Sequence, residues 1–395
     1  MPKPSLLLVS APCIVEENRK KLPALAESFD LTCVTCRHSR SIGFDVNLRA
    51  DPTQLPFHLI GLPTIGAVDT TTRYFFRGLR KVIASRKFDV ILVESEPWAF
   101  VRWQAWLWKR IHQPRAIFGE FTWENAARPG ARGWLLRICY RMAAASDDFV
   151  IAGNAAARRL FATVGFDPGR VLVAPQFGVD ETAFRPSSGD QRRDARVREG
   201  FSPDAILIGF CGRFVGEKGV LDLVSAVEAA ASRHPAVKIE LALLGSGPLQ
   251  PELDRLARER PWLRLLPPRS HTEVAGFMAL LDVFVLPSKS RRPGGVAWEE
   301  QFGHVLIEAM ACGVACIGSD SGAIPEVLGD VSLIFPAGDV SALGARLGKF
   351  AADPNLAAIL GAELRGRALR QFTHAAVAGQ WAAFLREHLA SRAPQ

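Results

Sequence analysis

Short apolar runs alternate with helix-length amphipathic segments along this chain of 395 residues. The runs are rich in valine, isoleucine and leucine and are bounded by glycine, proline and serine, a pattern typical of strands covered on both faces. Because the runs alternate with helices, the pattern predicts an α/β protein with doubly wound parallel sheets. The runs are residues 6–10, 31–35, 58–62, 90–94, 116–120, 149–152 and 171–174 in the first half, and 206–211, 239–244, 263–266, 283–286, 315–318 and 332–335 in the second.

A polar, turn-rich connector at residues 184–190 separates the two series of runs. We therefore predict two Rossmann-like domains, residues 1–183 and 184–373. Apolar residues at helical spacing in the tail predict a terminal helix at about residues 374–391 that packs back on the first domain. Two such sheets are expected to face a central cleft, with ligands at the carboxyl ends of the strands.

The composition indicates a globular chain, with 48% hydrophobic and 22% charged residues. No apolar run reaches the roughly 18 residues that span a bilayer, and the apolar part of residues 1–10 is too short for a signal peptide. We expect a cytoplasmic protein. Cys33 and Cys36 have the spacing of a metal or redox pair, but no second pair accompanies them, which favours a buried structural role.

The positive charge is confined to the first half of the chain. Residues 1–180 carry 24 Lys/Arg and 16 Asp/Glu, hence +8, whereas the remaining residues carry 24 of each. This imbalance suits an anionic partner, either an acidic membrane surface or a lipid phosphate. Nucleic acid is not favoured, because no motif for it is present.

Basic and aromatic residues are interleaved at residues 73–81 and 98–110. This mixture fits either a helix lying in a membrane interface or a core helix with a solvated basic face. We therefore expect a cytoplasmic protein that is free or peripheral on the inner face of the membrane.

A glycine-rich loop follows the strand at residues 206–211 and carries Arg213 and Lys218. Arginine offers a planar fork to phosphate oxygens, lysine offers a compact charge, and the following helix start adds backbone amides. Together they would cradle a diphosphate, although basic loop residues are also common without such a role. Gly245 and Gly247 end the next strand and fit either a backbone that approaches a ligand closely or a tight turn.

Two glutamates, Glu300 and Glu308, flank the glycine turn at Gly303. A helix over these eight residues would hold them roughly 12 Å apart, and a loop before Gly303 can bring Glu300 back over the helix start. Glu300 could accept hydrogen bonds from sugar hydroxyls. Glu308 lies among apolar neighbours, so its carboxylate should be paired, and a ribose diol is one such partner.

These motifs, in this order and spacing, resemble family 4 glycosyltransferases. The matching elements are Gly212-Arg213, Glu217-Lys218-Gly219, Gly245-x-Gly247-Pro248, Pro287-Ser288, Glu300 with Glu308-Ala309-Met310-Ala311-Cys312-Gly313, and Ser321-Gly322 with Pro325-Glu326. The resemblance implies the GT-B fold, a nucleotide-diphosphate-sugar donor, and transfer with retention of the anomeric configuration.

The resemblance also implies roles for individual residues. Arg213 and Lys218 would bind the diphosphate and stabilise the leaving group, Glu300 would contact the donor sugar, and Glu308 would hold the ribose. The remaining donor-binding positions are Gly212, Gly245, Gly247, Phe302, Gly303, His304 and Val305. The family needs no bound metal or cofactor, and the absence of an Asp-x-Asp sequence agrees with that.

The first half departs from the family pattern. Residues 11–18 lack the family's glycine loop, and residues 118–125 lack its histidine. Glu120 or Glu124 could take the acceptor-side place of that histidine, or either could be a capping or core-pairing carboxylate. Glu96 ends the preceding strand and would face the same site.

The sequence therefore predicts a retaining glycosyltransferase whose acceptor is a glycan, a lipid or a small molecule in cell-envelope, lipid or exopolysaccharide glycosylation. The alternatives are a catalytically silent protein that binds nucleotide-sugars, and a GT-B relative such as an epimerase or a phosphorylase.

Overall fold

A computed structural model describes residues 2–41, 44–48, 55–66, 72–126, 128–290, 298–353 and 355–392. The chain divides into two compact units. The N-terminal unit comprises Met1–Gly178 and His374–Gln395, and the C-terminal unit comprises Val179–Thr373. The division lies a few residues before the boundary predicted at 183/184, because the amide of Val179 already donates to the carbonyl of Phe372 (2.7 Å).

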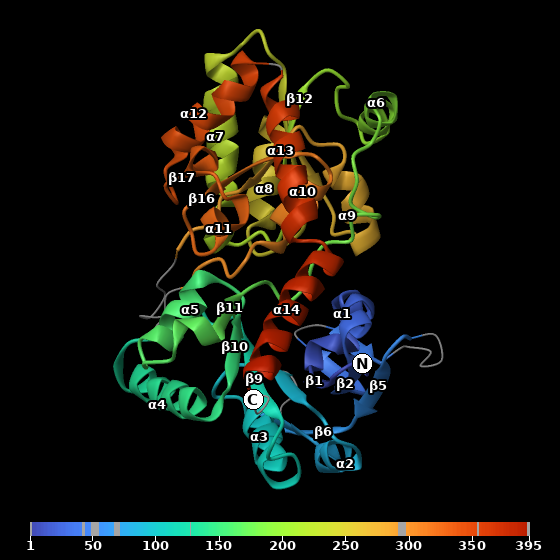
Figure 1. Ribbon diagram of the computed structural model, residues 1–395. Helices are drawn as coiled ribbons and strands as arrows, with labels where there is room; N and C mark the ends of the chain where they lie inside the picture. The colour runs from blue at the N-terminus through green and yellow to red at the C-terminus, as the bar shows by residue number, and fades with distance from the viewer. Residues whose placement is uncertain are drawn as a thin grey trace. The chain divides into compact units, whose positions relative to one another are not determined.

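The N-terminal unit is built on a seven-stranded parallel sheet in the order β11-β10-β9-β8-β1-β2-β5 (Figure 1). The chain moves outward from β1 to β5 and then returns to β8 on the other side of β1, as in a doubly wound sheet. The strands are β1 Ser5–Val9, β2 Asp30–Cys36, β5 His58–Leu62, β8 Val90–Glu94, β9 Ile117–Thr122, β10 Phe149–Ala152 and β11 Val171–Val173. The helices are α1 Leu22–Ser28, α2 Leu79–Ser85, α3 Phe100–His112, α4 Gly130–Ser146, α5 Ala155–Ala162 and α14 His374–Arg392.

The two faces of this sheet carry separate apolar clusters. Successive side chains of β1 point to opposite faces, so that Leu6 joins one cluster and Leu7 the other. The terminal helix α14 contributes Trp381 to the first cluster, and Trp381 is fully buried. The indole Nε1 of Trp381 donates to the carbonyl of Pro175 (3.2 Å). The C-terminal segment therefore completes the core of the N-terminal unit.

The C-terminal unit is built on a six-stranded parallel sheet in the order β14-β13-β12-β15-β16-β17 (Figure 1). The strands are β12 Ile206–Cys211, β13 Ile239–Leu244, β14 Leu263–Leu266, β15 Val283–Leu286, β16 Ala315–Ser319 and β17 Ile334–Phe335. The helices are α6 Gly189–Arg198, α7 Val220–Arg233, α8 Gln250–Glu259, α9 His271–Met278, α10 His304–Ala311, α11 Ile324–Leu328, α12 Val340–Ala352 and α13 Leu356–Gln371.

Each apolar run predicted as a strand overlaps a strand of the structure. The run at 332–335 is a strand only at its end, because Val331–Leu333 forms a 3-10 turn. Two small antiparallel pairs had no counterpart in the sequence prediction. They are β3 His38–Ser41 with β4 Phe44–Asn47, and β6 Thr64–Gly66 with β7 Tyr74–Phe76.

All seven cysteines are free thiols, and Cys33 and Cys36 lie buried in β2. This agrees with a structural role for the pair. Within the described part of the chain, no helix combines the length and the apolar character needed to cross a membrane.

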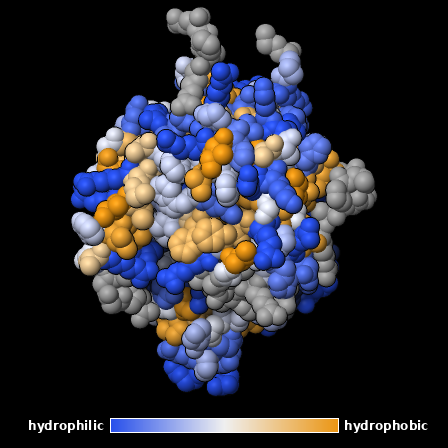
Figure 2. Space-filling model, turned by 90° about the horizontal axis from the view of Figure 1, so that it is seen from below, coloured by the Kyte–Doolittle hydropathy of each residue, from blue (hydrophilic) through white to orange (hydrophobic). Residues whose placement is uncertain are grey.

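The basic and aromatic helix predicted at residues 98–110 corresponds to α3. Its Phe100, Leu107 and Ile111 are exposed, whereas Val101 and Ala105 are buried in the core. Figure 2 looks at the molecule from the end at which α2 and α3 lie in Figure 1, and hydrophobic patches there are set among hydrophilic residues. One face of the helix therefore belongs to the core, and the membrane-interface alternative for its exposed face stays a prediction.

Candidate functional site

The donor motifs meet at the carboxyl-terminal edge of the sheet in the C-terminal unit. The loop after β12 carries Arg213 and Lys218, and the loop after β15 carries Ser288. Glu300 precedes α10, whose first residue is His304. Parallel strands present their carboxyl ends at one edge, which is where such sheets bind ligands.

Lys218 and Glu300 form an ion pair, with Lys218 Nζ 2.5 Å from Glu300 Oε2. The hydroxyl of Ser288 donates to the same oxygen (2.7 Å), and Lys218 Nζ also lies 5.1 Å from the ring centroid of Trp298. Glu300 is 8% exposed. Lys218 and Glu300, which lie 82 residues apart in the sequence, are therefore in direct contact. The sequence had assigned them to different parts of a donor, the diphosphate and the sugar.

The loop after β16 supports Glu300 from behind. A Cβ atom on Gly322, whose φ is 56°, would lie 2.0 Å from the backbone oxygen of Glu300. The amide of Ala323 donates to that oxygen (2.9 Å). This contact fixes the backbone of Glu300, which explains the small residues in this loop.

Glu308 lies in α10, is 5% exposed and is paired, as its apolar neighbours predict. His271 Nε2 and His304 Nδ1 lie 2.9 and 3.4 Å from its Oε1. Burial by itself raises the pKa of Glu308, but the hydrogen bonds and charges of the two histidines outweigh it and hold the pKa below its ordinary value. Neither contact uses Oε2.

Sequence reasoning missed His271, which begins α9 directly after the cap residue Ser270. Its position 37 residues before Glu308 gave no indication of the contact. The only available signal was a histidine at a helix start that follows a strand, β14. Its ring also packs on Phe184, with 5.0 Å between centroids.

The Gly-x-Gly turn after β13 packs against the loop after β12. A Cβ atom on Gly245 would lie 2.0 Å from the backbone oxygen of Gly212, and one on Gly247 would lie 2.5 Å from that of Phe214. The tight-turn alternative therefore accounts for both glycines. The absence of a Cβ atom at both positions allows the two loops to interlock, and the donor-binding role of the two glycines stays a prediction.

The first turn of α10 is a candidate anion site. Gly303, with a φ of 76°, directly precedes the helix and has no side chain with which to cap it. The amide of Leu306 donates to the carbonyl of Gly303 (2.8 Å). The backbone amides of a helix start and the helix dipole favour negative charge there. Phe302 is buried against Phe372 (5.8 Å between centroids), which anchors the turn, and His304 and Val305, in the first turn, are half-buried.

Arg213 is the exposed cation of this edge. Among the described residues, the structure contains no group of three or more histidine, cysteine, aspartate or glutamate side chains that could hold a metal ion. The positive charges and the amides are thus the features of the described edge that suit a diphosphate.

The acceptor-side carboxylates of the N-terminal unit differ from one another. Glu120 is fully buried in β9 and contacts Arg102 Nε (3.0 Å), and Arg102 also pairs with Asp147. Burial, reinforced by the charge of Asp147, holds the pKa of Glu120 well above its ordinary value. This geometry favours the core-pairing alternative for Glu120.

Glu96 and Glu124 lie closer to the surface, at the ends of β8 and β9. Thr122 Oγ1 and the amide of Trp123 (3.2 Å) donate to Glu96. Burial raises the pKa of Glu96 to about 7. Glu124 pairs with Arg128 (3.0 Å).

A buried ion pair that sequence reasoning missed lies beside them. Lys21 is fully buried, and its Nζ lies 2.7 Å from Glu94 Oε1 and 3.4 Å from the centroid of Trp381. Gln176 Nε2 donates to the other oxygen of Glu94 (2.8 Å). The sequence showed Lys21 only as the last residue of a basic run, whereas the structure uses it to join β8 to α14.

Comparison with known proteins assigns the family. Residues 205–353 match the model for "Glycosyl transferases group 1", and residues 21–176 match that for "Glycosyl transferase 4-like domain". Together the two matches take in most of the chain. Both halves of the chain match glycosyl transferase models, and the chain belongs to the glycosyltransferases.

Curated relatives share part of their length with this chain. The alpha-maltose-1-phosphate synthase of Mycolicibacterium smegmatis is 30% identical over 61% of this chain and 63% of that protein. The D-inositol 3-phosphate glycosyltransferase of Actinosynnema mirum is 32% identical over 48% of this chain and 45% of that protein. The chain thus matches less than two thirds of the length of either relative.

Solved structures share the fold. Sucrose-phosphate synthase from Thermosynechococcus elongatus has a TM-score of 0.69 at 20% identity, covering 98% of this chain and 100% of that one. Anabaena HepE in complex with UDP has a TM-score of 0.69 at 16% identity, covering 97% and 100%. The two parallel sheets and these neighbours define the GT-B glycosyltransferase fold.

Proposed function

We propose that this chain is a retaining glycosyltransferase that moves a sugar from a nucleotide-diphosphate-sugar to an acceptor. The observation that carries the proposal is the grouping of Lys218, Glu300 and the start of α10 at one strand edge of the C-terminal unit. Membership of the glycosyl transferase family supports the same activity.

The donor chemistry follows from charge. As the bond between the anomeric carbon and the diphosphate oxygen breaks, negative charge develops on the departing diphosphate. Arg213, Lys218 and the amides of α10 would oppose that charge, and preorganised donors of this kind are typically the largest catalytic contribution. In front-face attack, the acceptor oxygen bonds to the anomeric carbon while its proton passes to the leaving phosphate.

The ion pair between Lys218 and Glu300 would open when a donor binds. Lys218 Nζ would then contact the diphosphate, and Glu300 would accept hydrogen bonds from the sugar hydroxyls. Ser288 holds Glu300 at one oxygen in the meantime. Glu308, kept ionised by His271 and His304, would accept the ribose diol through Oε2.

The first donors to test are UDP-sugars, because Anabaena HepE, a neighbour in fold, is described in complex with UDP and with UDP-glucose. Binding can be measured as a rise in the unfolding temperature, since a ligand of the folded state stabilises it by mass action. We expect one nucleotide-sugar in a panel to stabilise the protein and Lys218→Ala to abolish that shift.

Lys238→Ala is the matched control, because Lys238 is an exposed lysine of the same unit (side chain 63% exposed) that pairs with Glu240. A donor that stabilises wild type and Lys218→Ala equally would show that the site lies elsewhere. A donor that binds without hydrolysis or transfer would instead favour the catalytically silent alternative.

The acceptor belongs to the N-terminal unit in this proposal, which extends to cell-envelope, lipid or exopolysaccharide glycosylation. The +8 excess of residues 1–180 and the exposed apolar residues of α3 support an acceptor that is anionic or borne by a membrane. The protein would then work on the inner face of the membrane as a peripheral enzyme.

A further inference from the structure

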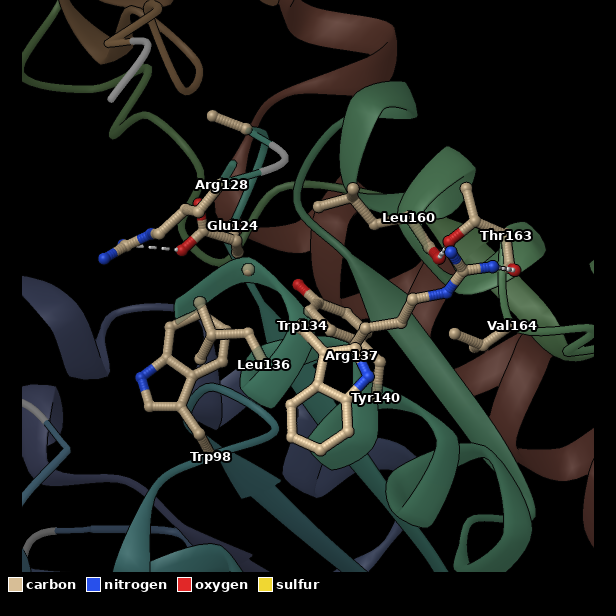
Figure 3. A pocket seen from close by; sticks show the side chains of 12 residues that line it. Trp98, Glu124, Arg128, Trp134, Leu136, Arg137, Tyr140, Leu160, Thr163 and Val164 are labelled. Atoms are coloured by element: carbon tan, nitrogen blue, oxygen red, sulfur yellow. Dashed lines mark hydrogen bonds and ion pairs between the residues drawn. The ribbon is translucent and has the colours of Figure 1, made fainter. Parts of the chain in front are cut away.

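The N-terminal unit contains a cavity of about 370 Å³ between α4, α5 and the loops that follow β8 and β9. Its volume lies within the range of small-molecule sites, roughly 300–1,000 Å³. Most of its lining is aromatic or aliphatic. The apolar residues are Trp98, Trp134, Leu136, Tyr140, Leu160 and Val164 (Figure 3).

Tyr140 contributes a polar group, its phenolic hydroxyl, to the cavity. Its side chain is 6% exposed, and its hydroxyl has no hydrogen-bond partner among the residues that the structure describes. The ring is held by Phe161 (5.0 Å between centroids) and Trp98 (6.1 Å). In Figure 3 the hydroxyl points towards the end of the cavity at which Glu124 and Arg128 lie. A buried hydroxyl without a partner costs free energy, so a ligand hydroxyl at this position would be favoured.

Glu124 and Arg128 form the charged end of the cavity. They are paired at 3.0 Å, and Arg128 also lies over the ring of Trp98 (5.7 Å to the centroid). Glu124 follows β9 at the carboxyl-terminal edge of the sheet. The cavity therefore runs from an apolar interior to a polar end at the edge where a doubly wound sheet binds its ligand.

The helix α4 extends the apolar character to the surface. Trp134 lines the cavity and yet is 67% exposed, and its neighbour Leu135 is 57% exposed. Arg132, Arg137 and Arg141 are exposed on the same helix. An amphipathic ligand could thus contact exposed apolar surface at Trp134 as well as the apolar interior of the cavity.

We propose that this cavity binds the alkyl or aryl part of the acceptor and presents a hydroxyl-bearing head to Tyr140 and Glu124. The inference rests on the proposed function, because it names the acceptor class of that glycosyltransferase. Glu124 and the Tyr140 hydroxyl suit a sugar or another polyol, and the aromatic lining suits the group to which that polyol is attached. The cavity has room for about a dozen water-sized groups, enough for a short chain or one ring.

The test is calorimetric titration of the full chain with octyl β-D-glucoside, below its aggregation concentration, and with phenyl β-D-glucoside. Glucose alone is the reference that lacks an apolar part. We expect at least one glucoside to bind and glucose not to bind detectably. Binding of the octyl probe alone assigns a lipid acceptor, and binding of the phenyl probe assigns a small aromatic one.

Two variants of adjacent residues on α4 form a matched pair. Leu136→Trp puts an indole into the cavity and should weaken glucoside binding about 10- to 100-fold, the equivalent of one buried apolar side chain. Leu135→Trp makes the same change at a position that does not line the cavity and should leave binding unchanged. Tyr140→Phe keeps the shape, removes the hydroxyl, and should weaken binding about fivefold.

Absence of binding by both glucosides, or equal effects of Leu136→Trp and Leu135→Trp, would overturn the proposal. An unchanged affinity in Tyr140→Phe would overturn the placement of the polyol head. A separate measurement, binding of UDP-glucose to the C-terminal unit, tests the proposed function. All three variants should bind UDP-glucose as wild type does. If wild type binds a glucoside but no nucleotide-sugar, the cavity is a glucoside-binding site and the glycosyltransferase proposal is wrong.

Discussion

The carboxylates predicted as site residues lie in different electrostatic environments in the two units of this chain. In the C-terminal unit Glu300 is paired with Lys218, and two histidines hold the pKa of Glu308 below its ordinary value. In the N-terminal unit burial raises the pKa of Glu96 to about 7 and that of Glu120 well above its ordinary value. Ionised carboxylates beside cations suit a diphosphate donor, whereas a carboxyl with a raised pKa binds a proton more readily and can then donate as well as accept hydrogen bonds. The comparison teaches that the predicted donor carboxylates are held ionised beside basic groups, whereas Glu96 and Glu120 bind a proton more readily, in a unit that also contains the ion pairs Lys21–Glu94 and Arg128–Glu124.

The largest expected effect is on turnover through the ion pair of the C-terminal unit. Lys218→Ala and Glu300→Gln should each lower transfer or donor hydrolysis by about 10²–10³-fold, the loss typical of one preorganised group that stabilises transition-state charge. Steady-state assays of nucleoside diphosphate release check this. Circular dichroism is the control for folding of both variants. Turnover close to that of wild type in both would show that Lys218 and Glu300 have no catalytic role.

The second expected effect is on donor affinity through Glu308. Glu308→Gln removes an ionised acceptor and should weaken nucleotide-sugar binding about 10-fold, as expected for a hydrogen bond to a charged group. Calorimetric titration measures it. Glu363→Gln, at an exposed glutamate of α13, is the control. Equal affinities of Glu308→Gln and Glu363→Gln for the nucleotide-sugar would contradict the assignment of Glu308 to the ribose.

The third effect is the pH dependence of stability through Glu96. The folded protein binds a proton there up to about pH 7, whereas an unfolded glutamate loses it near pH 4.5. Stability should therefore fall as the pH rises between these values, by up to about 3 kcal/mol. Glu96→Gln should remove that fall. Urea unfolding of wild type and variant at pH 4.5 and 7.5 checks the sign.

The matching control for Glu96 is Glu387→Gln, at an exposed position of α14. If Glu96→Gln and wild type lose stability in parallel as the pH rises, then Glu96 does not carry the raised pKa.

The smallest effect is on membrane binding by the basic N-terminal unit. We expect sedimentation with acidic liposomes at low salt, and release as salt screens the charges. Replacing Arg77 or Arg80 by glutamine, which removes one positive charge, should weaken binding by about 1 kcal/mol. No sedimentation at low salt would refute the peripheral-membrane proposal and leave the donor site untouched.

The sequence predicted the sheets because their strands are continuous apolar runs, a signal that depends only on burial. It missed β3–β4 and β6–β7, since strands of three or four residues carry no long apolar pattern. Motif order predicted the donor residues, but it did not predict the contacts between them. Lys218 and Glu300 lie 82 residues apart, and nothing local to either one indicates the pair.

Two further ambiguities had physical causes. Gly245 could not be assigned from sequence, because close packing against Gly212 and close approach to a ligand both require the absence of a Cβ atom. Glu120 and Glu96 both lie on strands or strand ends rich in apolar residues. Only the position of Arg102 distinguishes the core carboxylate from the one near the surface.

The central claim is that this chain transfers the sugar of a nucleotide-diphosphate-sugar with retention of the configuration of the anomeric carbon. Lys218 stabilises the diphosphate that leaves when the bond to the anomeric carbon breaks. Proton NMR of a reaction with the donor that stabilises the protein tests it most directly. The account predicts release of nucleoside diphosphate, a product whose anomeric configuration matches that of the donor, and loss of both signals in Lys218→Ala. A donor that binds and stays intact, or a product of inverted configuration, would contradict it.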